Sequence, residues 1–492
     1  MVQNDIDKLG KWKYFFILFL FTPAMLINFK MNNDIWFLLN TGRYILANGF
    51  PHTEPFTLHQ NFHFVVQQWL SSIIFWKIYD IAGSLGLFLL CNIIYIAMVL
   101  VFFKLSLLIS EKNFFVSYGV SLFVSLLASF LYITTRPQIF THLFIIIEIY
   151  LLELYIRNKN PRYLIGLPIL SFLQINFHAA MWPMLFVILI PYFIDGLSFN
   201  VFFIRSEGYG IKPLLITVLL MLAVAFLNPY GLEAMTYLFH SYGHKEISEA
   251  ITEMGIPNIN KFIGKTIFAH ALVFVFILCL WKKGKLSLRN LCLVLGTGYM
   301  SLSSIRSWCY FILCSGVALS EYLKEVNIPE TNEPSQKEIK TRKLLALFIT
   351  VLFIFGSGVR TKEALMPNEL PETYGSIEYL KENGYSPNDI TLYMDYNNGG
   401  YGEFEGYKPY LDPRAEVFVI ENNHVSDVML EYFNLQKGEL HYKDFINSYK
   451  FTHIIATPGD TLYTYIPKDP GYHLLYEDEE CSLYEANSYK KP

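Results

Sequence analysis

The feature that most constrains this chain is a series of long apolar runs separated by short polar segments. A helix needs about 20 mostly apolar residues to cross a bilayer, and runs near that length recur between residues 14 and 358. Composition agrees, because 53% of the 492 residues are hydrophobic and only 16% are charged, against about 25% charged in soluble domains. We therefore predict a mainly α protein with a polytopic transmembrane helical bundle.

We predict about eleven membrane spans. By residue range they are 14–29, 85–109, 114–134, 138–156, 163–178, 180–198, 212–227, 265–281, 290–304, 307–322 and 343–358. The first run has no small-residue cleavage site, so we interpret it as an uncleaved helix rather than a signal peptide. A shorter apolar stretch at 66–80 is a candidate re-entrant segment or twelfth span.

Basic residues of short loops favour the cytoplasm and so give an orientation. They form five groups, which lie on one side if about eleven helices alternate. The groups are Lys8, Lys11 and Lys13; Arg157, Lys159 and Arg162; Arg205 and Lys212; Lys282, Lys283, Lys285 and Arg289; and Lys337, Lys340, Arg342 and Lys343. A span at 66–80 would move later groups to the other face, so we reject it. We expect a plasma-membrane protein with a cytoplasmic N-terminus.

The chain changes character after residue 358, where the apolar runs shorten and acids, Asn, Gly and Pro appear. We therefore divide it into a transmembrane domain, 1–358, and a soluble extracytoplasmic domain, 359–492. The second reads as a small α/β domain with a helix from Gly375 to Asn383. Its short strands are predicted at 390–394, 410–411, 417–420, 453–457 and 481–484. Residues 325–336 read as a polar cytoplasmic linker.

Net charge and cysteine spacing exclude other classes of protein. The formal net charge of −4 indicates no nucleic-acid partner. The six cysteines include no CxxC pair, so neither a zinc site nor a disulfide framework is indicated.

Polar residues at the span junctions carry the functional signal, since ionisable groups cost about 2.5–3.5 kcal/mol each at the bilayer centre. In the predicted topology the clusters all face outward. They are Asp34; Arg136; Asn176 with His178; Asn228 in Asn-Pro-Tyr-Gly; and Arg306 after two serines. We predict an outward-facing polar cavity, roofed by residues 30–84, residues 229–264 and the C-terminal domain.

Each of these residues also has a structural interpretation. Arg136 and Arg306 are consistent with snorkelling to lipid headgroups. Asn176 and His178 are typical interhelical hydrogen-bonding groups. The segment beginning at Asn228 is a good helix stop, and Asp34 is a candidate N-cap for a helix beginning at Trp36.

The first outer loop resembles that of the bacterial polytopic glycosyltransferases of the GT-C superfamily, which include relatives of the dolichyl-phosphate-mannose–protein mannosyltransferases. The segment from Asp34 to Ile45, DIWFLLNTGRYI, carries this resemblance first. Further motifs follow in order: PHTEPFT at 51–57, QWL at 68–70, RPQ at 136–138, NFH at 176–178, NPYG at 228–231 and DPRA at 412–415. Gln68 stands where the superfamily usually has Glu.

The resemblance implies an enzyme that takes a sugar from a polyprenyl-phosphate carrier and passes it to an extracytoplasmic acceptor. It assigns the catalytic acid of the first outer loop to Asp34, with Glu54 as a candidate second acid. The substrate-binding residues that we expect are Arg136, His178, Asn176, Arg306, Gln68 and Asn228. The sugar and the acceptor, whether glycan, lipid or protein, are not indicated.

The chemistry of the transfer fits these residue types. A carboxylate within hydrogen-bond reach of the acceptor hydroxyl can act as general base, and arginine binds phosphate through a two-pronged fork. Asp34, Glu54 and His52 are also donors that a divalent metal accepts, although no spacing supports a metal site and none is assigned.

Two other functions remain open. A transporter or flippase of lipid-linked sugar would also need a polar cavity, but it would show broken helices and paired halves. A non-catalytic cell-envelope assembly protein would not depend on the Asp34 carboxylate.

Overall fold

The structure is a computed structural model, and it describes residues 18–23, 31, 33–129, 134–201, 204–241, 251–280, 285–326 and 370–491, with scattered positions between 344 and 362. The predicted first and last spans and the 325–336 linker therefore lie largely outside the described residues. The chain divides into two compact units. One comprises residues 1–29, 88–231 and 251–366, and the other comprises 30–87, 232–250 and 367–492.

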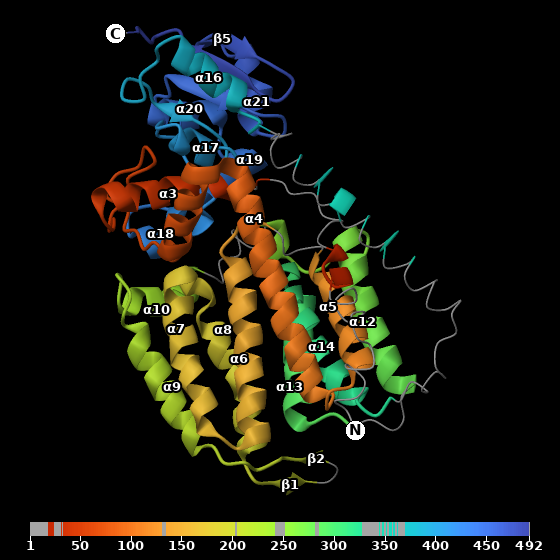
Figure 1. The fold of residues 1–492 in the computed structure, drawn as a ribbon. Coiled ribbons are helices and arrows are strands. Elements are labelled where there is room, and N and C mark those ends of the chain that lie inside the picture. The colour runs from red at the N-terminus through yellow and green to blue at the C-terminus, as the bar shows by residue number, and fades with distance from the viewer. Residues whose placement is uncertain are drawn as a thin grey trace. The chain divides into compact units, whose positions relative to one another are not determined.

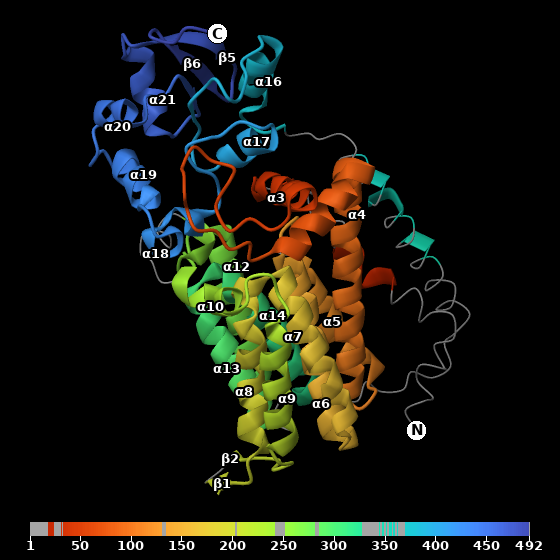
Figure 2. The same cartoon turned by 90° about the vertical axis from the view of Figure 1, so that its left-hand side faces the viewer.

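The first unit is a bundle of helices (Figure 1, Figure 2). Its elements in chain order are the second part of α4 (Trp69–Ile109), α5 (Phe114–Ser129), α6 (Gln138–Asn158), η2 (Pro161–Ile165), α7 (Gly166–Phe177), η3 (Ala179–Met181), α8 (Pro183–Gly196), β1 (Asn200–Val201), β2 (Ile204–Arg205), α9 (Lys212–Ala225), η4 (Thr252–Met254), α12 (Phe262–Leu280), α13 (Leu288–Ser303), η5 (Ile305–Ser307) and α14 (Trp308–Tyr322).

The predicted spans between residues 85 and 322 each coincide with one of these helices, to within a few residues. Among the described residues four helices are long and apolar enough to cross a membrane, at Trp69–Ile109, Gln138–Asn158, Ala179–Gly196 and Phe262–Leu280. Two shorter apolar helices are Phe114–Ser129 and Lys212–Ala225. The stretch at 66–80 contributes the first turns of α4, which bends at Gly83, where φ is +56°.

Small residues let the helices of the bundle approach closely, as is usual where lipid removes the hydrophobic drive for association. A Cβ on Gly316 of α14 would lie 2.4 Å from Val124 of α5. Hydroxyl groups link both of these helices to α4: Ser106 of α4 bonds Ser320 of α14 at 2.7 Å, and the Tyr95 hydroxyl of α4 bonds the Ser125 hydroxyl of α5 at 2.6 Å.

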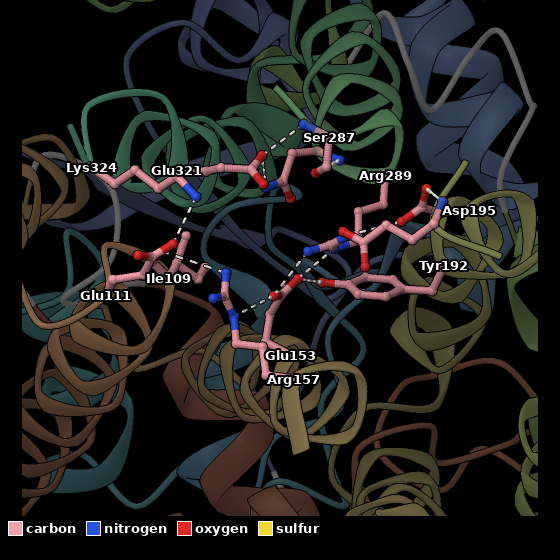
Figure 3. A network of polar contacts seen from close by, with 12 residues as sticks. Ile109, Glu111, Glu153, Arg157, Tyr192, Asp195, Ser287, Arg289, Glu321 and Lys324 are labelled. Atoms are coloured by element: carbon pink, nitrogen blue, oxygen red, sulfur yellow. Dashed lines mark hydrogen bonds and ion pairs between the residues drawn. The ribbon is translucent and has the colours of Figure 1, made fainter. Parts of the chain in front are cut away.

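A buried charge network joins α6, α8 and α13 near the end of the bundle that carries the β1–β2 hairpin (Figure 1, Figure 3). Arg289 donates to Glu153 at 2.8 Å and to Asp195 at 2.9 Å. Arg289 also pairs with Glu207, and Glu153 accepts from Tyr192 at 3.2 Å. Arg289, which the sequence indicates as a loop cation, therefore lies inside the first unit with only 1% of its surface exposed.

The second unit contains a four-stranded mixed sheet with the order β3-β4-β6-β5. Parallel pairing joins β3 (Leu392–Tyr393) to β4 (His453–Ala456), and β6 (Ser482–Ala486) is antiparallel to both β4 and β5 (Tyr472–Glu477). The other elements are α3 (Asp34–Asn48), the start of α4, α10 (Leu232–Ser241), α16 (Tyr374–Glu382), α17 (Gly399–Phe404), η6 (Ala415–Phe418), α18 (Ile420–Asn423), α19 (Val428–Lys437), α20 (Tyr442–Tyr449), α21 (Thr461–Tyr465) and η7 (Ile466–Lys468).

The predicted helix at 375–383 and the strands near 390, 453 and 481 are confirmed by α16, β3, β4 and β6. The strand predicted at 410–411 is wrong, because the carbonyls of this segment bind the first outer loop. Leu58 N donates to Pro409 O at 3.1 Å, and His59 Nε2 lies 2.7 Å from Tyr410 O.

The strand predicted at 417–420 is also wrong, since η6 and the start of α18 occupy this segment. Side-chain amides take the place of a neighbouring strand there. Asn422 Nδ2 donates to Glu416 O at 2.8 Å, and Asn423 Nδ2 donates to Val417 O at 3.1 Å. Residues 30–87 and 232–250 group with the C-terminal segment as one unit, so a single domain boundary at 358 stays a prediction.

Candidate active site

Two predicted arginines of the first unit meet at one carboxylate. Arg136 directly precedes Pro137, the N-cap of α6, and Arg306 lies in η5 between α13 and α14. Arg136 Nη1 lies 2.6 Å from Glu253 Oε2, and Arg306 Nη2 lies 3.5 Å from the same oxygen. The structure therefore brings together two cations that are 170 positions apart in the sequence (306 − 136).

Glu253 was not predicted as a site residue. Its segment is held against η5 by two hydrogen bonds, from Ser304 Oγ to Glu253 O at 3.2 Å and from Ile305 N to Gly255 O at 3.2 Å. Burial raises the pKa of Glu253, but the charges of Arg136 and Arg306 outweigh that effect, so the net pKa lies below the usual value. The group therefore carries two guanidiniums and one ionised carboxylate.

His178 lies in a polar cluster of the same unit. Its Nδ1 is 3.0 Å from Thr141 Oγ1, and Gln174 Nε2 donates to that oxygen at 3.0 Å and to His178 O at 2.9 Å. These contacts fix the orientation of the imidazole at the end of α7.

The two predicted asparagines hold helix ends. Asn176 Nδ2 donates to Phe172 O at 2.8 Å and to Leu227 O at 3.1 Å, which links α7 to the end of α9. Asn228 Nδ2 donates to Ala225 O at 2.7 Å and to Gly231 O at 3.0 Å, which closes the turn after α9. The structural interpretations of both residues are confirmed, and their contact with substrate stays a prediction.

In the second unit, the segment that begins at Asp34 forms α3, with Asn33 at the N-cap. Asp34 is half-buried and lies in the first turn, where the helix dipole favours negative charge. The helix begins at Asp34, two residues before the expected start at Trp36. The expectation that Asp34 is the N-cap is therefore wrong, because Asn33 holds that position.

The rest of this segment is explained by packing. The Trp36 ring packs edge-on against Tyr401 of α17 with centroids 5.0 Å apart. A Cβ on Gly42 would lie 2.2 Å from Ser72 O, so only glycine allows α4 to cross α3 so closely. Arg43 donates to Phe404 O at 2.6 Å. Together these residues fix α3 against α4 and α17.

Glu54 is buried in a charge cluster around Arg414. Its carboxylate accepts from Phe56 N at 2.9 Å, from Thr57 N at 3.0 Å and from Arg414 Nη2 at 3.0 Å. Only 3% of Glu54 is exposed. This arrangement indicates that Glu54 positions the first outer loop.

Arg414 is the centre of that cluster and belongs to the DPRA motif. It donates to Asp412 Oδ1 at 2.8 Å and to Glu403 Oε1 at 3.0 Å, and its guanidinium lies 5.1 Å from the Phe64 ring centroid. Burial lowers the pKa of Arg414, but the surrounding acids outweigh that effect and raise it well above its ordinary value. Arg414 therefore stays charged and fastens the first outer loop to the C-terminal segment.

Gln68 lines a small recess in the second unit, with a volume of about 10 Å³, which is room for about one water molecule. Thr41, Tyr237 and Glu416 also line it. Glu416 accepts from Gln67 Nε2 at 3.0 Å. The recess offers hydroxyl, amide and carboxylate groups beside aromatic side chains.

A metal centre built from Asp34, Glu54 and His52 does not fit this structure, because Arg414 and the loop amides already bind the Glu54 carboxylate. Within the described part of the chain, no group of three or more His, Cys, Asp or Glu side chains is arranged to hold a metal ion. The predicted residues thus form two sets. Arg136, Arg306, His178 and the asparagines belong to the first unit, and Asp34, Glu54 and Gln68 belong to the second.

The fold, a bundle of apolar helices with a small mixed sheet, is that of the GT-C glycosyltransferases. Its structure is similar to that of the Archaeoglobus fulgidus oligosaccharyltransferase tethered to an acceptor peptide, with a TM-score of 0.58 and 11% identity over 97% of this chain and 74% of that one. It is also similar to apo ArnT from Cupriavidus metallidurans, with a TM-score of 0.53 and 10% identity over 97% and 98%. No protein-family model and no curated protein matches the sequence.

Proposed function

We propose that this protein is a membrane glycosyltransferase that moves a sugar from a polyprenyl-phosphate carrier to an extracytoplasmic acceptor. The observation that carries the proposal is the meeting of Arg136 and Arg306 at one anionic oxygen, in a chain with the GT-C fold. Two guanidiniums at helix ends suit a phosphate, because each presents a planar fork of donors.

In the proposed reaction the acceptor hydroxyl attacks the anomeric carbon of the sugar. Asp34 takes the hydroxyl proton, a new carbon–oxygen bond forms, and the bond from the anomeric carbon to the phosphate oxygen breaks. The carrier phosphate leaves with the electron pair, and Arg136 and Arg306 stabilise the charge that it gains.

The remaining predicted residues have supporting roles. Glu54 positions the first outer loop through Arg414. His178 and Gln68 are proposed substrate contacts, the first at the end of α7 and the second at the recess. Asn176 and Asn228 hold the helix ends near which the carrier phosphate would bind.

The proposed orientation follows from the basic loops, with the N-terminus in the cytoplasm and residues 370–491 outside. In this orientation the donor is consumed on the outer face of the plasma membrane. The apolar carrier would lie along the bundle, among its abundant phenylalanine and leucine side chains.

A transfer assay tests the proposal. The full-length protein in lipid nanodiscs is given radiolabelled polyprenyl-phosphate sugars and envelope extracts as acceptor, and labelled product is measured. We expect Asp34→Asn to lose at least about 100-fold in rate, since a positioned base contributes about 10²–10⁴-fold. Asp80→Asn is the matched control, because Asp80 is an exposed acid of the same predicted loop.

Arg136→Gln and Arg306→Gln should each raise the donor concentration that the reaction needs. Arg162→Gln is their control, because Arg162 is exposed and lies in η2. Full transfer by Asp34→Asn would contradict the general-base mechanism. Such a result would favour a transporter or an assembly protein instead.

A further inference from the structure

Glu253 binds where the proposed function requires a phosphate. Its Oε2 lies 2.6 Å from Arg136 Nη1 and 3.5 Å from Arg306 Nη2. A single oxygen shared by two guanidiniums is the arrangement expected of a non-bridging phosphate oxygen. In the structure the Glu253 carboxylate supplies that oxygen.

The charges match as well. The donor is a phosphodiester with one negative charge, the same charge as a carboxylate. An incoming phosphate and the Glu253 carboxylate therefore compete for the same two guanidiniums. When the sugar leaves, the carrier becomes a monoester with about two negative charges, which both guanidiniums can balance only if Glu253 is elsewhere.

The local structure lets the side chain move without its backbone. Ser304 Oγ and Ile305 N hold the carbonyls of Glu253 and Gly255 against η5. The Glu253 side chain is 45% exposed, whereas those of Arg136 and Arg306 are 18% and 23% exposed. The Glu253 carboxylate is therefore less enclosed than either guanidinium.

We infer that the Glu253 carboxylate occupies the position of the carrier phosphate at Arg136 and Arg306 and is displaced when the lipid-linked substrate binds. This inference rests on the proposed function. Glu253 then lowers the affinity for the carrier phosphate and, by returning to the arginines, helps to expel the spent carrier. Its role is to tune phosphate binding, and it takes no part in proton transfer.

The test measures binding rather than turnover. Full-length protein in nanodiscs is titrated with undecaprenyl phosphate, and inorganic phosphate is used as a competitor. Undecaprenol, which has no phosphate, reports binding through the lipid alone. These probes separate recognition of the phosphate from recognition of the chain.

We expect Glu253→Gln to bind undecaprenyl phosphate about fivefold more tightly than the unaltered protein, because phosphate no longer has to break the ion pair. Fivefold corresponds to the upper end of the strength of a partly exposed ion pair. Glu253→Ala should behave in the same way, which guards against a new contact made by the amide. Glu233→Gln is the matched control, because Glu233 is an acid of the same predicted outer loop and pairs with His63 rather than with either arginine. Its affinity should not change.

Two failures are distinguishable. If Arg136→Gln and Arg306→Gln weaken phosphate binding but both Glu253 variants bind no more tightly than the unaltered protein, the displacement is refuted and the phosphate site stands. If undecaprenyl phosphate binds no better than undecaprenol and neither arginine matters, the proposed function itself is refuted.

Discussion

Arg289→Gln is the substitution for which the structure gives the clearest expected cost. Arg289 donates to Glu153 at 2.8 Å and to Asp195 at 2.9 Å, and both acids are fully buried (Figure 3). Removing one partner of a buried ion pair costs about 3–5 kcal/mol, because the other charge is left in a medium that solvates it poorly. Glutamine preserves most of the volume and some donors, so charge is the main loss.

The remaining contacts place the expected cost at the lower end of that range. Glu153 keeps Tyr192 at 3.2 Å and Arg157 at 3.4 Å, and Asp195 keeps the amide of Glu207 at 3.1 Å. We therefore expect a loss of about 3 kcal/mol. For a unit of this size that corresponds to a fall in the unfolding midpoint of roughly 5–10 °C.

The assay uses the protein's own thiols. Cys91, Cys309 and Cys314 are buried, so a thiol-reactive dye reports the opening of the bundle as detergent-solubilised protein is heated. A second variant combines Arg289→Gln with Glu153→Gln and so removes both members of the Arg289–Glu153 pair. It should recover part of the lost stability, because Glu153 no longer carries an uncompensated charge. An unfolding midpoint for Arg289→Gln equal to that of the unaltered protein, or of the exposed control Arg162→Gln, would refute the reasoning.

Two further predictions concern the membrane. Glu148 of α6 is fully buried, and its two carboxyl oxygens have no hydrogen-bond partner within the described part of the chain. Burying an unpaired polar group costs free energy, so Glu148→Leu should raise the unfolding midpoint measured with the thiol dye or leave it unchanged. A clear fall in that midpoint would indicate a partner for the carboxyl group. Protease added outside intact cells should cleave within residues 370–491, as the basic-loop orientation requires; protection of that segment, with cleavage only after lysis, would reverse the orientation.

The helices of the bundle could be predicted from sequence because lipid leaves few alternatives. A spanning segment must satisfy its own backbone hydrogen bonds, so a long apolar run becomes a helix of nearly the same length. The runs at 138–156 and 212–227, for example, correspond to α6 and α9. Sequence reasoning also found Arg136 and Arg306, since a charged residue at a span junction needs an explanation.

The partners of those residues could not be predicted, because they depend on contacts across long distances in the chain. Glu253 lies in the loop 229–264, whose polar composition distinguishes no single acid. Arg289 follows three lysines within seven residues and so reads as one more loop cation. Only the packing of α6 and α8 shows that Glu153 and Asp195 receive it. Glu153 and Asp195, which both lie within apolar runs, could have served as a signal. An acid buried in such a run favours a nearby cation, so the two acids together indicate that a basic residue enters the bundle.

The strand errors have the same origin. The run from Val417 to Ile420 is apolar and β-branched, as in a strand. Asn422 and Asn423 lie a few residues further on, and their amides bind the carbonyls that a neighbouring strand would have bound. The hydrogen bonds of these two side chains therefore outweighed the local preference for a strand. An alternation of apolar and polar residues gives no information about such hydrogen bonds.

The structure shows which of the two proposed site acids of the first outer loop, Asp34 or Glu54, can be tested for chemistry. Glu54 is bound by Arg414 and two loop amides, so its replacement would loosen the fold and lower activity for that reason alone. Asp34 lies in the first turn of α3, where an acid adds only about 0.3–1 kcal/mol to helix stability. Trp36 and Gly42 also pack α3 against its neighbours. A large loss of transfer in an Asp34→Asn variant that keeps the unfolding midpoint of the unaltered protein would identify the carboxylate as part of the reaction.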